Sequence, residues 1–316
     1  MRRQRLSVIF NIVIVICQLI GTILAFSGNE MLWPMRYYTV DSNMFCMVAC
    51  AGCAYFGIQV LRGKRDSIPD SWLFHKYMAV CTVSVTFLVV IFVIAPLSSF
   101  DNDMGLKAAE TAALLKQGMI WHHLLGPVLA IFSLAFIEKR IRPDRYRFPM
   151  FRAMAFNIIY QAIIYAMNYF YLLDGPYPFM RIRYMPAWQS FLWWAIIFVF
   201  SIMIAYGNWI LWQGMYKRIE TEEAAKPAAR FLAQIPNAVY QVSFALGYIG
   251  VMVYSAYRSY WVHRDFSGIF GSFGGIVGEL FTIIFFGSLL GIALTVIVGL
   301  IRGIFLKIFF TKEERA

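Results

Sequence analysis

The sequence predicts an all-α membrane protein, a polytopic transmembrane helix bundle of about eight spans with both termini in the cytoplasm. Three observations predict this fold class. Of the 316 residues, 60% are hydrophobic and only 14% are charged, whereas about a quarter of the residues in a soluble domain are charged. The apolar residues gather into runs of about 20, the length of a helix that crosses a bilayer. The basic residues concentrate in alternate connections between these runs.

The spans follow from the apolar runs in order along the chain. Each run must be helical, because lipid offers no hydrogen-bond partner to backbone N–H and C=O groups. Strands of a β-barrel are excluded, since they would be short and would alternate polar with apolar residues. The eight predicted spans are Leu6–Phe26, Asn43–Leu61, Tyr77–Leu97, Met119–Ile137, Arg152–Leu173, Gln189–Leu211, Asn237–Tyr257 and Gly274–Ile301.

The distribution of basic residues predicts the orientation of the spans. Most of the 28 Lys and Arg residues lie near the two termini and in the connections that follow even-numbered spans, Lys76 among them. Cytoplasmic loops carry such an excess, so both termini are predicted to be cytoplasmic, in a multi-pass protein of the plasma membrane. The net charge of +11 then reflects topology and attraction to anionic membrane lipids. Nucleic acid is not an expected partner.

The chain is predicted to divide into a six-span module, residues 1–212, a cytoplasmic connection, residues 213–236, and a two-span addition, residues 237–316. The last span is rich in glycine at a spacing of four, which lets helices approach closely. This pattern allows ordinary packing inside one bundle, and it also allows a homo-oligomer. The glycines concerned are Gly274, Gly278, Gly287 and Gly291.

Three patches on the predicted outer side carry the polar residues best suited to chemistry. They are Thr39 with Asp41, Ser42 and Asn43 at the second span, His122 and His123 at the fourth, and Asp174, Tyr177 and Phe179 between the fifth and sixth. A hydroxyl, an imidazole base and a group that orients the base are the components of nucleophilic catalysis. The alternative is structural: Thr39 as a helix-capping residue, and the histidines as hydrogen-bonding residues at the membrane interface.

Glu279 is a charged residue inside the last predicted span. An intramembrane acid is a functional candidate by default, although a place near the outer end also allows a solvated or protonated side chain.

Cys46, Cys50 and Cys53 share one face of the second span, and we interpret them as small packing residues. No metal or cofactor is expected.

The same patches give the chain a family resemblance. The pieces are Tyr38-Thr39-Val40-Asp41-Ser42-Asn43, Thr86-Phe87-Leu88-Val89-Val90 with Ala95-Pro96, His122-His123-Leu124-Leu125-Gly126-Pro127 and Tyr177-Pro178-Phe179. In this order the chain resembles, over residues 1–212, the androgen-induced-gene-one family of multispan membrane threonine hydrolases, including its bacterial six-span relatives. The last two spans are additional to the family pattern.

The resemblance implies an intramembrane hydrolase of lipid esters of the fatty-acyl type, with membrane lipids around it and a lipid ester as substrate. The family's nucleophile corresponds to Thr39, and its histidine to His122 or His123. Candidates to orient the imidazole are Asp41, Asp101, Asp103 and Asp174, and candidates to bind the oxyanion are Ser42 and Asn43. The competing hypothesis is a non-enzymatic carrier of lipid or small solutes, or a membrane assembly subunit.

Overall fold

The computed structural model is helical, and among the residues that it describes there is no β-strand. The described residues are 2–27, 33–94, 119–141, 146, 148–173, 175–177, 180, 182–184, 187–214, 235, 237–263 and 273–309. The chain forms two compact units, Met1–Trp212 and Gln213–Ala316. The predicted all-α class is therefore confirmed.

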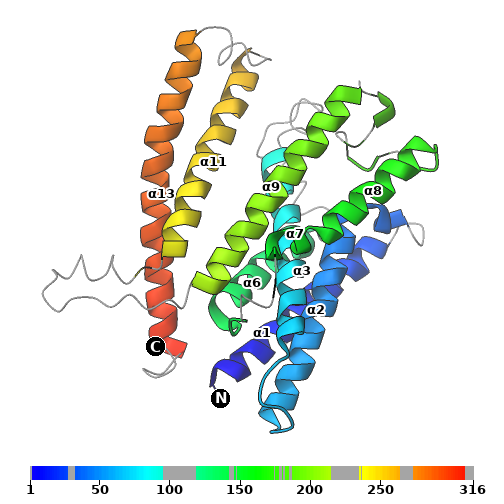
Figure 1. The fold of residues 1–316 in the computed structure, drawn as a ribbon, viewed down its shortest axis with the longest axis vertical. Helices are drawn as coiled ribbons and strands as arrows, with labels where there is room; N and C mark the ends of the chain where they lie inside the picture. The colour runs from blue at the N-terminus through cyan, green and yellow to red at the C-terminus, as the bar shows by residue number, and fades with distance from the viewer. Residues whose placement is uncertain are drawn as a thin grey trace, which may run out of the picture. The chain divides into compact units, whose positions relative to one another are not determined.

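Seven α-helices and five shorter turns of helix make up the described part of the first unit (Figure 1). The α-helices are α1 (Arg2–Phe26), α2 (Tyr38–Leu61), α3 (Asp70–Val89), α6 (Gly126–Phe132), α7 (Pro149–Ala153), α8 (Ala155–Tyr169) and α9 (Ala187–Gly214). The 3₁₀ turns are η1 (Trp33–Arg36) and η8 (Ile182–Tyr184), and the π-helical turns are η2 (Val90–Ile94), η4 (Trp121–Leu125) and η5 (Ser133–Ile137).

Four described helices are long and apolar enough to cross a membrane: α1, α2, α3 and the segment Thr282–Phe305. Three shorter apolar helical segments, Trp121–Ile137, Ile197–Gln213 and Val239–Ser255, accompany them. This composition is compatible with a helical membrane bundle, because a spanning helix needs about 20 apolar residues. The number of spans and the orientation stay predictions.

The end of the second helix agrees with the apolar run, whereas the start of the third differs from it. The second helix ends in a Schellman motif, in which Lys64 N–H donates to Gln59 O and Gly63, at φ +68°, donates to Val60 O. The next helix starts at Asp70, directly after Pro69, rather than at the predicted Tyr77. Hydropathy marks where the apolar run begins, whereas the helix begins where backbone capping allows it. The prediction that Lys76 lies in a loop is wrong, because α3 contains it.

A π-helical turn precedes Pro127. Proline has no N–H to donate to the carbonyl of His123, and Gly126 N–H instead donates to the oxygen of Trp121. The widened turn Trp121–Leu125 carries both histidines. Such π-turns are often found at functional sites.

The core of the first unit lies where α1, α2 and α3 pack together. Cys46, Cys50 and Cys53 are all fully buried there, which agrees with their interpretation as packing residues. Tyr77 and Trp212 stack in the same core with ring centroids 5.8 Å apart. These contacts tie the last turn of α9 to α3.

The described helices of the second unit are α11 (Asn237–His263) and α13 (Phe273–Phe309), which pack as a hairpin (Figure 1). Glycines allow this approach, because a Cβ on Gly247 would lie 2.4 Å from the Gly287 oxygen. A Cβ on Gly291 would lie 2.9 Å from Phe244 Cα. Two of the four glycines predicted for a homo-oligomer, Gly287 and Gly291, therefore make contacts inside this hairpin.

Substituting Gly247 with alanine is expected to loosen the hairpin. The added methyl group would meet backbone atoms of α13 that have no room to move, and overpacking of this kind costs about 1–3 kcal/mol. Amide hydrogen exchange along α11 should become faster. Gly278→Ala is the matched control, since no described atom lies within 4 Å of that Cβ position. Equal exchange in the two variants would contradict the close-packed interface.

Candidate functional site

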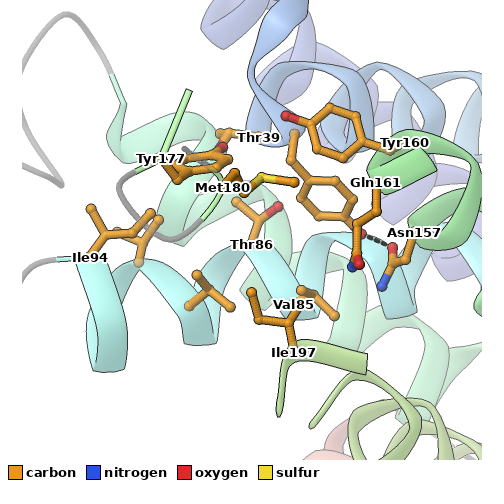
Figure 2. A pocket seen from close by; sticks show the side chains of 13 residues that line it. Thr39, Val85, Thr86, Ile94, Asn157, Tyr160, Gln161, Tyr177, Met180 and Ile197 are labelled. Carbon is orange, nitrogen blue, oxygen red and sulfur yellow. Dashed lines mark hydrogen bonds between the residues drawn. The ribbon is translucent and has the colours of Figure 1, made fainter. Parts of the chain in front are cut away.

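A small cavity lies within the first unit, between α2, α3, α8 and α9. Apolar side chains such as Val85, Ile94 and Ile197 form much of its wall (Figure 2). Polar residues of its lining come from four segments that are distant in sequence: Thr39 of α2, Thr86 of α3, the face of α8, and Tyr177.

Thr39 lies at the wall of this cavity as the second residue of α2, with 6% of its surface exposed. The hydroxyl of Tyr177 hydrogen-bonds to the Thr39 side chain and accepts from the main-chain N–H of Thr39, and Figure 2 shows the two side chains next to each other. Burial raises the pKa of Tyr177 to about 12. The phenol therefore stays protonated at neutral pH, and its proton is available for donation to a bound molecule.

Ser42 and Asn43 hold the backbone of Thr39. Ser42 Oγ donates to the Thr39 oxygen at 3.1 Å, and Asn43 Nδ2 donates to the same oxygen at 2.6 Å. Asn43 Nδ2 also lies 3.2 Å from the His122 oxygen, so one amide links α2 to η4. Ser42 Oγ pairs with Thr86 Oγ1 at 2.8 Å. Both residues were candidates to bind an oxyanion, but their donors serve the main chain here.

The His122 imidazole is completely buried and turned toward α1. Its Nε2 lies 3.2 Å from the Gln18 oxygen and 3.3 Å from Thr22 Oγ1. Because a carbonyl only accepts, Nε2 carries the proton and Nδ1 carries the lone pair. Nδ1 has no hydrogen-bond partner among the described residues. Gly21 makes room for the ring, since a Cβ there would lie 2.4 Å from His122 Cδ2.

His123 is half-buried in the same π-turn, and Asp41 is half-buried in the first turn of α2. Neither histidine is among the described residues that line the cavity. The structure thus brings Thr39, Tyr177, Ser42 and Asn43 together. It joins the main-chain oxygen of His122 to them through the Asn43 amide, whereas the His122 imidazole faces α1.

The remaining predicted site residues are placed elsewhere. Glu279 belongs to the second unit, where its Oε2 accepts a hydrogen bond from Ser255 Oγ on α11. Its side chain is half-buried. Asp101, Asp103, Asp174 and Phe179 lie outside the described residues.

Sequence reasoning missed the amides of Asn157 and Gln161, which line the cavity from α8. They stand one turn apart on the buried face of an otherwise apolar helix. Uncharged polar residues at helical spacing inside a predicted span were the available signal. Amides carry no formal charge, so the distribution of charged residues does not reveal them.

A second buried polar cluster, also missed, lies in the first unit around Lys76 and Glu138. Both side chains are buried, and Lys76 Nζ lies 2.5 Å from Glu138 Oε1. Lys76 Nζ also donates to Asn11 Oδ1 at 2.7 Å and to Ser133 Oγ at 2.8 Å. All three ammonium hydrogens therefore have acceptors.

Donors from the first helix surround the carboxylate of Glu138. Ser7 Oγ donates to Oε2 at 2.9 Å, and Asn11 Nδ2 donates to Oε1 at 2.8 Å. Arg3 closes the cluster by donating to the main-chain oxygens of Ile137 and Glu138, each at 2.8 Å. The cluster joins the beginnings of α1 and α3 to the end of η5.

Fold and site together define an all-helical, membrane-type protein with a buried threonine hydroxyl at an apolar cavity. No family model, no curated protein and no solved structure matches the chain.

Proposed function

We propose that the protein is an integral membrane hydrolase of fatty-acyl lipid esters, with Thr39 as its nucleophile. The observation that carries the proposal is the position of the Thr39 hydroxyl, at the wall of an apolar cavity and hydrogen-bonded to the half-buried phenol of Tyr177. An acyl chain suits such a wall because burial of apolar surface favours its binding. The motif resemblance over residues 1–212 leads independently to the same residue.

The proposal includes eight spans with both termini in the cytoplasm of a plasma-membrane protein. The hydrogen bonds of Lys76 and Glu138 to the first turns of α1 support this topology. They place the start of the first helix and the start of the third on the same side of the bundle. Thr39 stands at the start of α2, the helix between them in sequence. Alternating direction of consecutive helices is what this topology requires.

The reaction proceeds through an acyl-threonine. Thr39 Oγ attacks the ester carbonyl while an imidazole of η4 takes its proton. The proton passes to the alcohol oxygen as the carbon–oxygen bond breaks, and the acyl group remains on Thr39. Water then attacks the new ester and gives its proton to the imidazole. The fatty acid leaves when that proton returns to Oγ.

Tyr177 stabilises the oxyanion that forms on the carbonyl oxygen in both steps. Its hydroxyl lies in hydrogen-bond contact with Thr39, and a preorganised donor at this place contributes about a hundredfold or more in kcat. Tyr177→Phe is expected to lower kcat by that factor with little change in KM. Tyr77→Phe is the control, because it removes a buried hydroxyl that bonds to the Ala205 oxygen, outside the cavity. Equal kcat in both variants would exclude this role.

The base is one of the two imidazoles of η4. Substituting each with alanine in turn tests this, and the true base should lose activity by about 10²–10⁴-fold. His122→Ala also removes the bonds to Gln18 and Thr22, so folding must be checked by circular dichroism. Full activity in both variants would show that neither His122 nor His123 is the base.

Labelling with a long-chain fluorophosphonate tests the proposal as a whole. The probe reacts with activated hydroxyl nucleophiles, and mass spectrometry should locate the adduct on Thr39. The carrier hypothesis uses the same apolar cavity for binding alone. Saturable binding of a fluorescent fatty acid together with no labelling of Thr39 would favour the carrier and end the hydrolase proposal.

A further inference from the structure

Three fully buried polar side chains lie around the π-turn η4, where α1 and α2 pack against it: Gln18, Asn43 and His122. His122 Nε2 lies 3.2 Å from the main-chain oxygen of Gln18, and Asn43 Nδ2 lies 3.2 Å from the main-chain oxygen of His122. The Gln18 amide packs against Gly126, where a Cβ would lie 2.3 Å from its Nε2 atom. Side chains of two helices therefore meet at this turn.

Proline explains the position of the Asn43 amide. In a π-turn the N–H of residue i+5 donates to the oxygen of residue i. For the His122 oxygen that residue is Pro127, which has no N–H. Asn43 Nδ2 donates to this oxygen instead, so the donor end of the amide is used and the acceptor end is not.

Four polar atoms at this turn have no hydrogen-bond partner within the described part of the chain. They are Gln18 Nε2, Gln18 Oε1, Asn43 Oδ1 and His122 Nδ1. A buried polar group without a partner is unfavourable, and in folded proteins nearly all such groups are paired with protein or with ordered water. Four of them around one turn indicate a bound polar molecule.

The hydrogen-bonding capacity of the four atoms selects the kind of molecule. Two amide oxygens and the lone pair of His122 Nδ1 are acceptors, and Gln18 Nε2 is the one donor group. A cation would find no acid among these side chains, and an anion would face three acceptors, so both are disfavoured. Water can donate to two of the acceptors and accept from Gln18 Nε2, which gives about three hydrogen bonds, the usual number for a buried water.

We propose that Gln18, Asn43 and His122 bind an internal water molecule at η4, and that this water is the hydrogen-bond partner of His122 Nδ1. The site does not depend on the proposed hydrolase. Water fits it better than a larger ligand, because the neighbouring glycines Gly21 and Gly126 bring the side chains close to the backbone.

The water has one consequence that rests on the proposed function. Thr39 Oγ is not a hydrogen-bond partner of His122 Nδ1, so a proton that passes between them needs a molecule in the path. Water at η4 can accept the Thr39 proton while it gives one of its own to Nδ1. Gln18 is then a positioning residue, which holds the water for His122.

Stability of Gln18→Met in the full-length protein is the first test, because its sign depends on the water. Methionine keeps the length of the side chain and removes both polar atoms. If the amide binds water, the equilibrium constant for unfolding in SDS mixed micelles should rise about tenfold. If the amide has no partner at all, the same substitution removes an unfavourable buried group and should stabilise the protein, which would overturn the water site.

NMR of protein with isotope-labelled histidine observes the water directly. The His122 ring, assigned by its loss in His122→Gln, should show the Nε2–H tautomer, a hydrogen-bonded Nδ1 and a cross-peak to water. The cross-peak should vanish in Gln18→Met and persist in Gln161→Met, which replaces a buried glutamine of α8. A His122 ring without a cross-peak in the wild type, or a cross-peak that survives Gln18→Met, also overturns the site.

Hydrolysis of a fluorogenic dodecanoate separates the water site from the hydrolase. Gln18→Met is expected to lower kcat about a hundredfold with little change in KM, since Gln18 does not line the cavity. Full kcat in a variant that has lost the water signal overturns the proton path and leaves the water site in place. A wild type that shows the water signal but hydrolyses no ester ends the proposed function, and the water site stands.

Discussion

Thr39→Ala is expected to lower kcat/KM for a fatty-acyl ester by about 10⁴-fold or more, because loss of a nucleophile removes the covalent route altogether. The cavity and Tyr177 would remain, so binding of a fatty acid should change little. Thr39→Ser keeps a hydroxyl at the same place and should retain measurable activity. Hydrolysis of a fluorogenic ester by protein in detergent micelles measures all three variants.

The matched control for this loss is Thr82→Ala. Thr82 is a buried threonine of α3 whose hydroxyl donates to the Ala79 oxygen, and it does not line the cavity. It reports the effect of removing a buried threonine side chain without touching the site. Hydrolysis by Thr39→Ala at the wild-type rate would show that another group performs the chemistry, and the assignment of Thr39 would have to be abandoned.

Glu138→Ala is expected to destabilise the protein by about 3–5 kcal/mol, because it leaves the ammonium of Lys76 buried without its counter-charge. Lys76 is completely buried, and its other partners are neutral oxygens of Asn11 and Ser133. The double variant Lys76→Met, Glu138→Leu removes both charges together and should recover most of the loss. Unfolding by SDS in mixed micelles, followed by circular dichroism, measures the difference.

Tyr77→Phe is the reference for the loss of one neutral hydrogen bond, and it should lower the free energy of unfolding by about 1 kcal/mol. If the double variant is as unstable as Glu138→Ala, the uncompensated charge is not the cause of the loss. Burial by itself would raise the pKa of Glu138, but the Lys76 ammonium and its hydrogen bonds hold it below the ordinary value. The contribution of the pair should therefore be complete above about pH 4.3 and disappear as pH falls through the lower pKa of the folded state.

Much of the helical fold is predictable from composition alone. Each long described helix coincides with an apolar run, because a chain in lipid must satisfy its backbone groups within the segment. The residues at which the helices begin and end are less predictable from hydropathy. The start of α3 at Asp70 depends on Pro69 and the Schellman turn before it, which hydropathy does not register. The predicted loop position of Lys76 failed for this reason.

The candidate site was predictable in part. Thr39 and Tyr177, more than a hundred residues apart, were both chosen from the sequence, and the structure joins them by hydrogen bonds. The roles of Ser42 and Asn43 changed, since their donors hold the Thr39 carbonyl. The α8 amides were not chosen, because polarity without charge carries little signal within an apolar run.

The sequence by itself determined that this chain is a helical membrane-type protein, because its hydrophobic content exceeds what a soluble fold of this size can bury. It also determined which hydroxyl and imidazole groups are available for chemistry. Only the tertiary structure decided that Tyr177 meets Thr39, that His122 turns toward α1, and that Lys76 pairs with Glu138. These contacts join separate helices, and their geometry depends on how side chains from distant segments pack, which local sequence patterns do not encode.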